Sequence, residues 1–203
     1  MSRFPIRQWT RRARAPSPSG QSKCEGTTLT DREFLVSTDP ARIPIADLID
    51  AFGQDFVYWG NPLPEAEMRR LVEASLCFAL YVKVTGENVE ESAVGHANND
   101  STQQQQRQYR LIGFARLITD CITFGYLTDF YVLPEYQGLG LGTWMLKCLE
   151  EVLDGWPHLR RFLLLTRSER SKRYYEKLLG MQVVAEPQPS LYYMVRGGPA
   201  MPF

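Results

Sequence analysis

The sequence contains no run of apolar residues that approaches the length of a membrane span, so we expect no membrane-spanning segment. Its four cysteines, at positions 24, 77, 121 and 148, form no CxxC pair and no ligand cluster. The two histidines, His96 and His158, stand alone in the sequence. We therefore predict reduced thiols, a cytoplasmic location and no metal site.

The chain also lacks an overall charge, because 23 basic residues balance 23 acidic ones. Residues 1–23 hold six of the basic residues and no acid, which leaves 17 basic and 23 acidic residues, a net charge of −6, in the rest of the chain. A net-acidic body argues against a nucleic-acid partner and favours a cationic substrate. Hydrophobic content of 44% in 203 residues is ordinary for one α/β domain with its own core.

Two segments have little of the apolar content that a packed core requires. Residues 1–28 are rich in Arg, Ser and Pro, and we predict a flexible basic tail before a domain that spans residues 29–203. The absence of acids before Glu25 also permits a mitochondrial transit peptide, and the basic run from Arg11 to Arg14 permits a nuclear signal. Residues 85–108 are polar and Gln-rich, which indicates an insertion within a hairpin.

The stretch from Asp129 to Asp154 is the most informative part of the sequence. A strand pattern over residues 127–133 leads through a Pro-Glu-Tyr turn into the glycine-rich loop 137–142. A helix follows, on which apolar residues recur at helical spacing, namely Met145, Leu149, Val152 and Leu153. Glycines let a backbone approach its ligand, and the N–H groups of a helix N-terminus point at it, so this pattern is typical of an anion site. The alternative is a turn that only packs a helix on a sheet.

The rest of the chain predicts an α/β domain. Strand patterns occupy residues 33–38, 76–82, 110–119, 161–166, 182–185 and 191–195, in addition to residues 124–133. Helices are expected over residues 40–52, 64–75 and 168–179, besides the one after the glycine-rich loop. Ser168 is a plausible N-cap for the last of these helices.

Two motifs resemble the GNAT N-acetyltransferase superfamily. Gln137-x-x-Gly140-x-Gly142 resembles its phosphate loop, [RQ]-x-x-G-x-[GA], and the segment from Tyr175 to Met181 resembles its Y-E-K-x-G-F segment, with one extra residue before the glycine. The resemblance covers residues 33–196. It implies a GNAT fold, with a central mixed, mostly antiparallel sheet of about seven strands, a splayed fourth and fifth strand pair, and flanking helices.

The resemblance also implies a function. We expect transfer of the acetyl group of acetyl-CoA, as co-substrate, to a primary amine of a small molecule by direct attack in a ternary complex. Acetylation of a protein lysine or N-terminus is one alternative, and a coenzyme-binding regulatory module without catalysis is another. A monomer or a homodimer is expected, with no nucleic-acid or membrane partner.

In this superfamily, the free edge of the splayed strand and the phosphate loop hold the coenzyme, with help from the later helix. Matching the motifs carries this role to a set of residues in three segments: Phe130, Tyr131, Val132, Gln137, Gly138, Leu139, Gly140, Leu141, Gly142, Thr143 and Ser171.

The resemblance assigns catalytic roles to three residues. Tyr175 matches the tyrosine that protonates the departing thiolate, although the extra residue before Gly180 leaves Tyr174 as an alternative. Thr128 stands where a glutamate often acts as the base, and threonine can only hold a water there. Asp129 can accept a proton, but strand alternation puts it on the opposite face to Thr128 unless a bulge turns it. A buried structural pair with Arg116 is the competing interpretation of Asp129.

Three aromatic residues are candidates for the substrate site. Tyr58 and Trp59 lie between the first two predicted helices, which overhang the acetyl group in the GNAT pattern. Neighbouring residues of a loop point in different directions, so we expect one of this pair to anchor in the core and the other to face the cleft, where its ring can receive an ammonium group. Tyr126 is expected to line the same wall.

Overall fold

A computed structural model describes residues 4–16, 29–84 and 108–183, and the side chains of residues 15, 16, 29 and 30 are left out. The chain divides into two compact units, Met1–Leu165 and Thr166–Phe203, which are described separately. The predicted insertion at 85–108 and the predicted final hairpin at 182–195 fall almost entirely outside the described residues.

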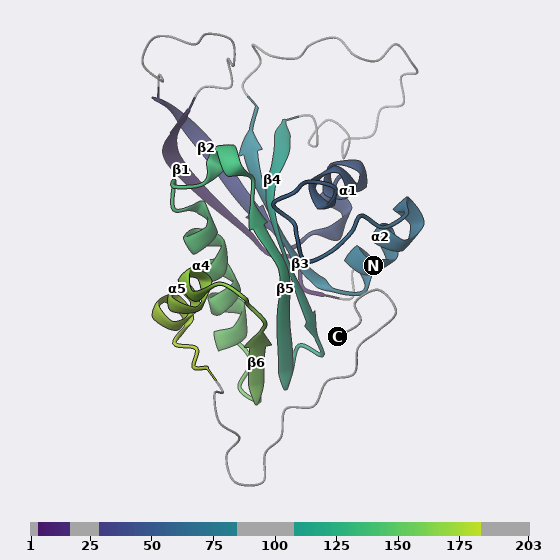
Figure 1. Ribbon diagram of the computed structural model, residues 1–203, viewed down its shortest axis with the longest axis vertical. Coiled ribbons are helices and arrows are strands. Elements are labelled where there is room, and N and C mark those ends of the chain that lie inside the picture. The colour runs from purple at the N-terminus through teal and green to yellow at the C-terminus, as the bar shows by residue number, and fades with distance from the viewer. Residues whose placement is uncertain (1–3, 17–28, 85–107, 184–203) are drawn as a thin grey trace. The chain divides into compact units, whose positions relative to one another are not determined.

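The first unit is built on a six-stranded sheet in chain order (Figure 1). Five strands pair antiparallel with their neighbours, and the sixth pairs parallel with the fifth, so the predicted mixed, mostly antiparallel sheet is confirmed. The strands are β1 (Gln8–Pro16), β2 (Leu29–Ser37), β3 (Leu76–Lys83), β4 (Tyr109–Thr119), β5 (Phe124–Val132) and β6 (Arg161–Leu164).

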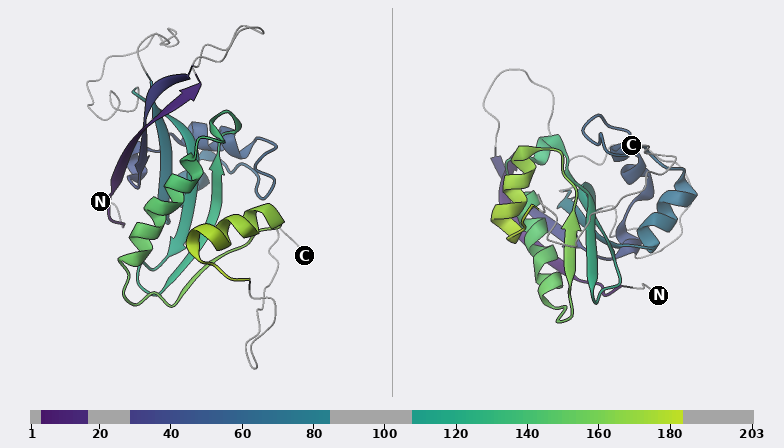
Figure 2. Two further views of the ribbon diagram at one scale, coloured as in Figure 1. Left: turned by 90° about the vertical axis from the view of Figure 1, so that its left-hand side faces the viewer. Right: turned by 60° about the horizontal axis from the view of Figure 1, so that its bottom comes forward.

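Helices cover both faces of this sheet. Helices α1 (Ile45–Phe52) and α2 (Glu65–Glu73) lie on one face, and α4 (Leu141–Asp154) lies on the other (Figure 2). The buried positions of α4 follow the spacing expected of a helix with one apolar face. Phe52 of α1, Val72 of α2 and Tyr131 of β5 belong to one buried cluster, so both helices pack onto the middle of the sheet.

The prediction of a flexible tail over residues 1–28 is wrong for the residues that form β1. Strand β1 pairs with β2 over nine residues, from Gln8↔Ser37 to Pro16↔Leu29, and Phe4 before it is buried. The Arg-rich composition is compatible with a strand because β1 is the edge of the sheet, where charged side chains reach solvent. Trp9 supplies the apolar contact, since its ring stacks on Phe78 of β3 with the centroids 6.1 Å apart.

The first predicted helix is divided in two. A short 3-10 turn, η1 (Pro40–Arg42), is capped by the Asp39 side chain, which accepts a hydrogen bond from the Ala41 N–H. Helix α1 then begins after Pro44. Proline cannot donate the backbone hydrogen bond that a continuous helix requires, so it separates the two elements.

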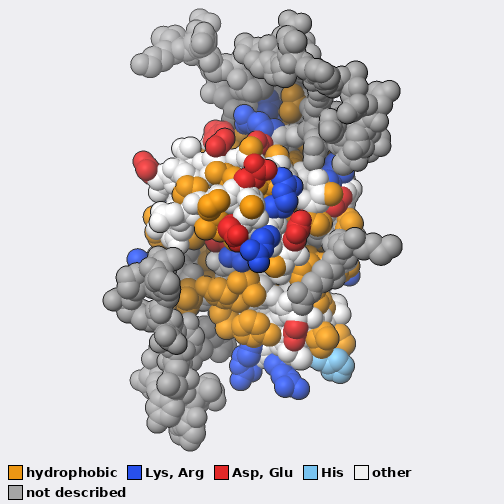
Figure 3. All heavy atoms as spheres, turned by 90° about the vertical axis from the view of Figure 1, so that its right-hand side faces the viewer, with side chains coloured by type: hydrophobic (Ala, Val, Ile, Leu, Met, Phe, Trp, Pro, Cys, Tyr) orange, Lys and Arg blue, Asp and Glu red, His pale blue; other side chains and the backbone are white. Residues whose placement is uncertain are grey.

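The α1 and α2 side of the molecule has a group of hydrophobic side chains at its surface. In Figure 3 this group lies below an area in which acidic and basic side chains are interspersed. The strand register places Ile118, Tyr126 and Leu163 side by side on this face, at the end of the sheet that the β4–β5 hairpin forms.

No helix among the described residues is long and apolar enough to cross a membrane.

Gly113 of β4 marks a close approach between strands that a side chain would disturb. A Cβ atom there would lie 2.9 Å from the Tyr131 carbonyl oxygen and 3.1 Å from a Leu80 methyl group. We expect Gly113→Ala to lower the free energy of unfolding by about 1–3 kcal/mol and the melting temperature by roughly 3–10 °C. Gly60→Ala is the control, because its Cβ would meet only the Phe52 ring at 3.9 Å. Equal melting temperatures for the two variants would contradict the close approach.

Candidate active site

The glycine-rich loop turns sharply between β5 and α4. The chain passes from β5 through a 3-10 turn, η2 (Pro134–Tyr136), into the loop. Gly138 and Gly140 have φ angles of 80° and 71°, in the left-handed region that side chains disfavour. Gly140 is the N-cap of α4, and its carbonyl accepts the first helical hydrogen bond, from the Trp144 N–H at 3.0 Å. The glycines are therefore required by the backbone path that starts the helix.

This loop has the properties of an anion cradle. The first N–H groups of a helix have no carbonyl partner within the helix, so those of Leu141 and Gly142 point out from its N-terminus. The first turn of α4 carries no acidic residue. A Cβ atom on Gly138 would meet nothing within 4 Å, which leaves the loop backbone open to a ligand. The loop thus has the backbone geometry of an anion site, and its role in binding the coenzyme stays a prediction.

The edge of β5 before this loop is not covered by β6. The two strands pair in parallel only over four residues, from Phe124↔Arg161 to Leu127↔Leu164. Strand β5 continues to Val132, so Phe130, Tyr131 and Val132 lie beyond the last β6 pair among the described residues. Because β1 was not predicted, β5 and β6 are the fourth and fifth strands of the predicted order, and the predicted splay of this pair is confirmed. Gln137 reaches back to this edge, where its side-chain amide donates to the Val132 carbonyl at 2.9 Å.

A β-bulge interrupts β5 at Asp129. Arg116 pairs with Thr128 and Phe114 pairs with Tyr131, so Asp129 and Phe130 both lie opposite Ala115. Asp129 has a φ of 53°, a left-handed conformation that aspartate tolerates better than most residues. The bulge breaks the alternation that would otherwise separate the side chains of Thr128 and Asp129.

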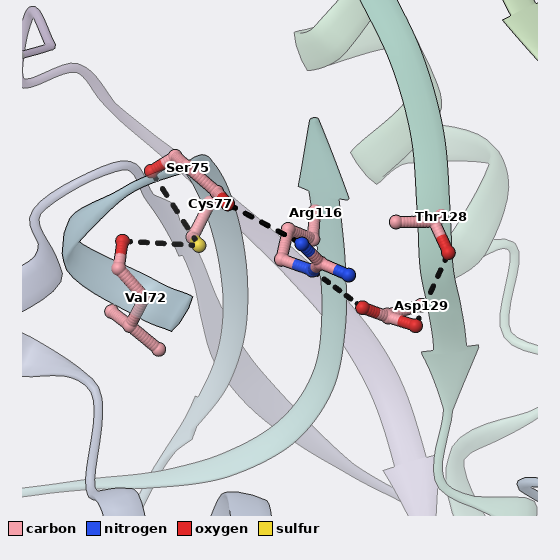
Figure 4. A network of polar contacts seen from close by, with 6 residues as sticks. All are labelled: Val72, Ser75, Cys77, Arg116, Thr128 and Asp129. Atoms are coloured by element: carbon pink, nitrogen blue, oxygen red, sulfur yellow. Dashed lines mark hydrogen bonds and ion pairs between the residues drawn. The ribbon is translucent and has the colours of Figure 1, made fainter. Parts of the chain in front are cut away.

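The bulge gives Asp129 two partners (Figure 4). Its Oδ2 accepts from Nε of Arg116 at 2.5 Å, and its Oδ1 accepts from the Thr128 hydroxyl at 3.2 Å. The Asp129 and Arg116 side chains are only 7% and 16% exposed. Arg116 also donates to the Ser75 hydroxyl at 3.4 Å, which links the pair to the end of α2. The predicted Arg116 partner of Asp129 is therefore present, and the catalytic role of Asp129 stays a prediction.

Asp129→Asn tests the structural role of this carboxylate, which neutralises the buried Arg116. Asparagine also tolerates a left-handed backbone and keeps an acceptor oxygen, so the change removes mainly the charge. Because a buried guanidinium is left uncompensated, we expect a loss of about 3–5 kcal/mol in unfolding free energy. Thr128→Val is the control that keeps the ion pair. Thermal melts of both variants measure the effect, and an unchanged melting temperature for Asp129→Asn would contradict a structural role.

Tyr58 and Trp59, the two aromatic residues after α1, differ in their exposure to solvent, as the sequence predicts. Tyr58 is 65% exposed, whereas Trp59 packs against the buried cluster under α1 and α2. Their rings meet edge to face with centroids 5.1 Å apart. The Trp59 indole N–H is buried and has no hydrogen-bond partner within the described part of the chain. Tyr58 is the ring that remains open to a ligand, and its role stays a prediction.

Buried tyrosine hydroxyls are a feature that the sequence analysis missed. The hydroxyls of Tyr81 and Tyr131 are buried without a hydrogen-bond partner among the described residues. Burial raises the pKa of Tyr131, and the charges of Asp47 and Asp129 raise it further. The Tyr131 ring packs against those of Phe52, Phe56 and Phe114, so only its backbone lies at the splayed edge. No local sequence signal separates such a tyrosine from an ordinary core aromatic residue.

The second unit contains helix α5 (Glu169–Leu179) and, within it, the predicted general acid. The Ser168 side chain caps the helix by accepting from the Ser171 N–H at 3.3 Å, as predicted. Gly180 ends the helix with a left-handed φ of 61°. Tyr174 and Tyr175 are both half-buried, with ring centroids 5.5 Å apart. The choice between them as proton donor stays open.

Comparisons with known proteins agree with this architecture. The profile of the Acetyltransferase (GNAT) family matches residues 48–181. A Gibberella zeae protein named "Putative acetyltransferase" is 40% identical over 153 residues, which cover 75% of this chain and 81% of the relative. A crystal structure of a GNAT-family protein from Xanthomonas campestris pv. campestris has 28% identity and a TM-score of 0.55, and the match covers 80% of this chain and 93% of that one.

A GNAT-family protein from Streptococcus pneumoniae TIGR4 shares the fold at 17% identity, with a TM-score of 0.50 over 82% of this chain and 97% of that one. The mixed sheet and the helices on its two faces match the GNAT fold. The chain belongs to the GNAT acetyltransferase family.

Proposed function

We propose that the protein transfers the acetyl group of acetyl-CoA to a primary amine of a small molecule. The observation that carries the proposal is the continuity of the splayed β5 edge with the anion loop, which are separated only by η2. One segment of chain thereby offers an extended backbone edge and a phosphate cradle in succession. This arrangement suits a ligand that consists of a pantetheine arm and a pyrophosphate.

Acetyl-CoA, when bound, supplies the acetyl group as an activated thioester. The N–H groups of residues 138–143 would hold its pyrophosphate, because they surround the N-terminus of α4. The backbone of Phe130, Tyr131 and Val132 would orient the pantetheine arm and polarise the carbonyl group, as oxyanion-hole donors do. Tyr175, or Tyr174 beside it, would protonate the leaving thiolate, and Ser171 lies one turn before Tyr175 on the same helix.

The amine must lose a proton before it attacks. Thr128 and Asp129 are hydrogen-bonded to each other next to the splayed edge, and together they can hold a water that passes this proton to the Asp129 carboxylate. The acidic body of the chain favours a cationic substrate, and the exposed Tyr58 ring offers an aromatic face to an ammonium group. Tyr126 lies on the same face of the sheet as Thr128, two residues before it.

Two buried cysteines, Cys77 and Cys148, are poorly suited to form a covalent acetyl-enzyme, which favours direct attack. Burial raises the pKa of Cys77 to about 12, and burial also raises that of Cys148 to about 12. A thiol with such a pKa is protonated at neutral pH and is a poor nucleophile. Cys77 in addition lies against the carbonyl oxygens of Val72 and Ser75, within the network of Figure 4.

A coenzyme-binding module without catalysis is the second candidate. Two observations favour it. Thr128 stands where a glutamate often acts as the base, and the carboxylate of the neighbouring Asp129 already accepts from both Arg116 and Thr128. The two candidates differ in turnover. A catalyst consumes acetyl-CoA in the presence of some amine, and a binding module consumes none.

A panel of amines tests the proposal. The protein is incubated with acetyl-CoA and polyamines, amino sugars, amino acids or lysine-containing peptides, and mass spectrometry identifies the products. We expect an N-acetylated small amine. Acetylated peptides with unchanged small amines would favour a protein acetyltransferase instead, and binding of acetyl-CoA without any product would favour the regulatory module.

A further inference from the structure

Strand β1 brings a cationic side chain to the phosphate loop from outside the segment that matches the family. The match begins at residue 48, whereas β1 occupies Gln8–Pro16. The Arg11 guanidinium donates from NH1 to the Gly140 carbonyl at 3.4 Å. A Cβ atom built on Gly140 would point toward the same nitrogen, at 3.9 Å. Arg11 therefore lies beside Gly140, the residue that begins the helix of the anion cradle.

The loop provides no cation of its own. The segment from Pro134 to Leu146 contains no Lys or Arg, and its one acid, Glu135, faces Arg110 at 3.7 Å. Gln137 occupies the position where the family motif allows arginine, and its side chain is directed back to the Val132 carbonyl. The segment itself therefore offers a phosphate no positively charged side chain.

Arg11 differs from the other arginines of this segment in the group that its side chain contacts. Arg7, Arg12 and Arg14 each face a carboxylate, namely Glu151, Glu33 and Asp31 respectively. The Arg11 side chain has no carboxylate partner in the described part of the chain, and its one hydrogen bond there goes to the Gly140 carbonyl. Its charge is thus uncompensated, and most of its five N–H donors remain available.

The position of Arg11 is fixed by the strand that carries it. Trp9 and Arg11 share one face of β1, because alternate residues of a strand point to the same side. The Trp9 indole donates to Glu151 of α4 at 2.9 Å while its ring stacks on Phe78. The start of the strand is held by Thr38, whose hydroxyl accepts from the Arg7 N–H at 2.7 Å. The strand therefore runs along α4 and reaches the N-terminus of this helix at Arg11.

We propose that Arg11 binds the pyrophosphate of acetyl-CoA together with the backbone of the glycine-rich loop. This inference rests on the proposed function, since it needs the coenzyme in the loop. A guanidinium matches phosphate oxygens with two parallel donors, and such charge-assisted hydrogen bonds are stronger than neutral ones. Strand β1 then acts as an extension of the coenzyme site rather than as a structural addition to the sheet.

Calorimetric titration of the full chain with acetyl-CoA at low and high salt tests this role. We expect Arg11→Gln to raise the dissociation constant about tenfold at low salt and less at high salt. Arg12→Gln is the matched control, because Arg12 is the next residue, points to the other face of β1 and lies 3.9 Å from Glu33. Both variants should melt like the wild type without ligand. Equal dissociation constants for the two variants would overturn the proposal.

Acetyl-CoA carries two phosphate groups that Arg11 could bind, the pyrophosphate and the 3′-phosphate, and the dephosphorylated coenzyme distinguishes between them. Acetyl-dephospho-CoA keeps the pyrophosphate and lacks the 3′-phosphate, so Arg11→Gln should weaken its binding by the same factor. A loss seen only with intact acetyl-CoA would overturn the pyrophosphate assignment. Failure of the wild type to bind acetyl-CoA would overturn the proposed function itself, which distinguishes that outcome from an error about Arg11 alone.

Discussion

A Gly140→Glu variant is expected to bind acetyl-CoA on the order of a hundredfold or more weakly than the wild type. Gly140 starts helix α4 at a φ of 71°, and a Cβ atom on it would lie 3.9 Å from a nitrogen of the Arg11 guanidinium. A glutamate there would put a negative charge where the pyrophosphate is expected, and it would draw Arg11 away from the pyrophosphate. Because a ligand that binds only the folded state raises the melting temperature, the variant should also lose the stabilisation by acetyl-CoA.

Gly140→Asn separates the charge from the backbone effect. Asparagine tolerates the left-handed conformation and carries no charge, so its loss of affinity should be smaller. Melting temperatures without ligand show whether each variant is folded. A folded Gly140→Glu protein with unchanged affinity for acetyl-CoA would refute the assignment of the phosphate loop.

Tyr175→Phe is expected to lower kcat on the order of a hundredfold, with little change in acetyl-CoA affinity. The change removes one hydroxyl and keeps the ring, so the contact with Tyr174 persists. An effect confined to kcat is the signature of a group that acts in the transition state.

Tyr174→Phe is the matched control on the same helix. If that variant loses turnover and Tyr175→Phe does not, the general acid is Tyr174, and the extra residue before Gly180 has shifted the motif by one position. If neither variant loses turnover, both tyrosines of α5 are excluded as the proton donor.

Local rules were sufficient where neighbouring residues determine the structure. The turn after β5, the left-handed glycines and the apolar face of α4 all follow from residues close together in sequence. The Ser168 cap of α5 is of the same kind. The anion loop could therefore be predicted from the sequence together with its place between a strand and a helix.

Long-range contacts account for what the sequence did not predict. Strand β1 has the composition of a solvated tail, and it is ordered by pairing with β2 and by the contacts of Trp9 with Phe78 and Glu151. The bulge at Asp129 is a property of the register between β4 and β5, which the sequence of β5 alone does not specify. Arg11 and Gly140 are 129 positions apart in the sequence. Arg11 became a candidate binding residue only because the fold brings the two residues together.

The stoichiometry of the reaction tests the central claim most directly. The protein is incubated with acetyl-CoA and an amine that the panel identifies, and liquid chromatography with mass spectrometry measures free CoA and acetylated amine in the same sample. We predict one acetylated amine for each CoA released, and no release above the uncatalysed rate when the amine is omitted. Release of CoA without an acetylated amine, or tight binding of acetyl-CoA with no product from any amine, would contradict an amine acetyltransferase.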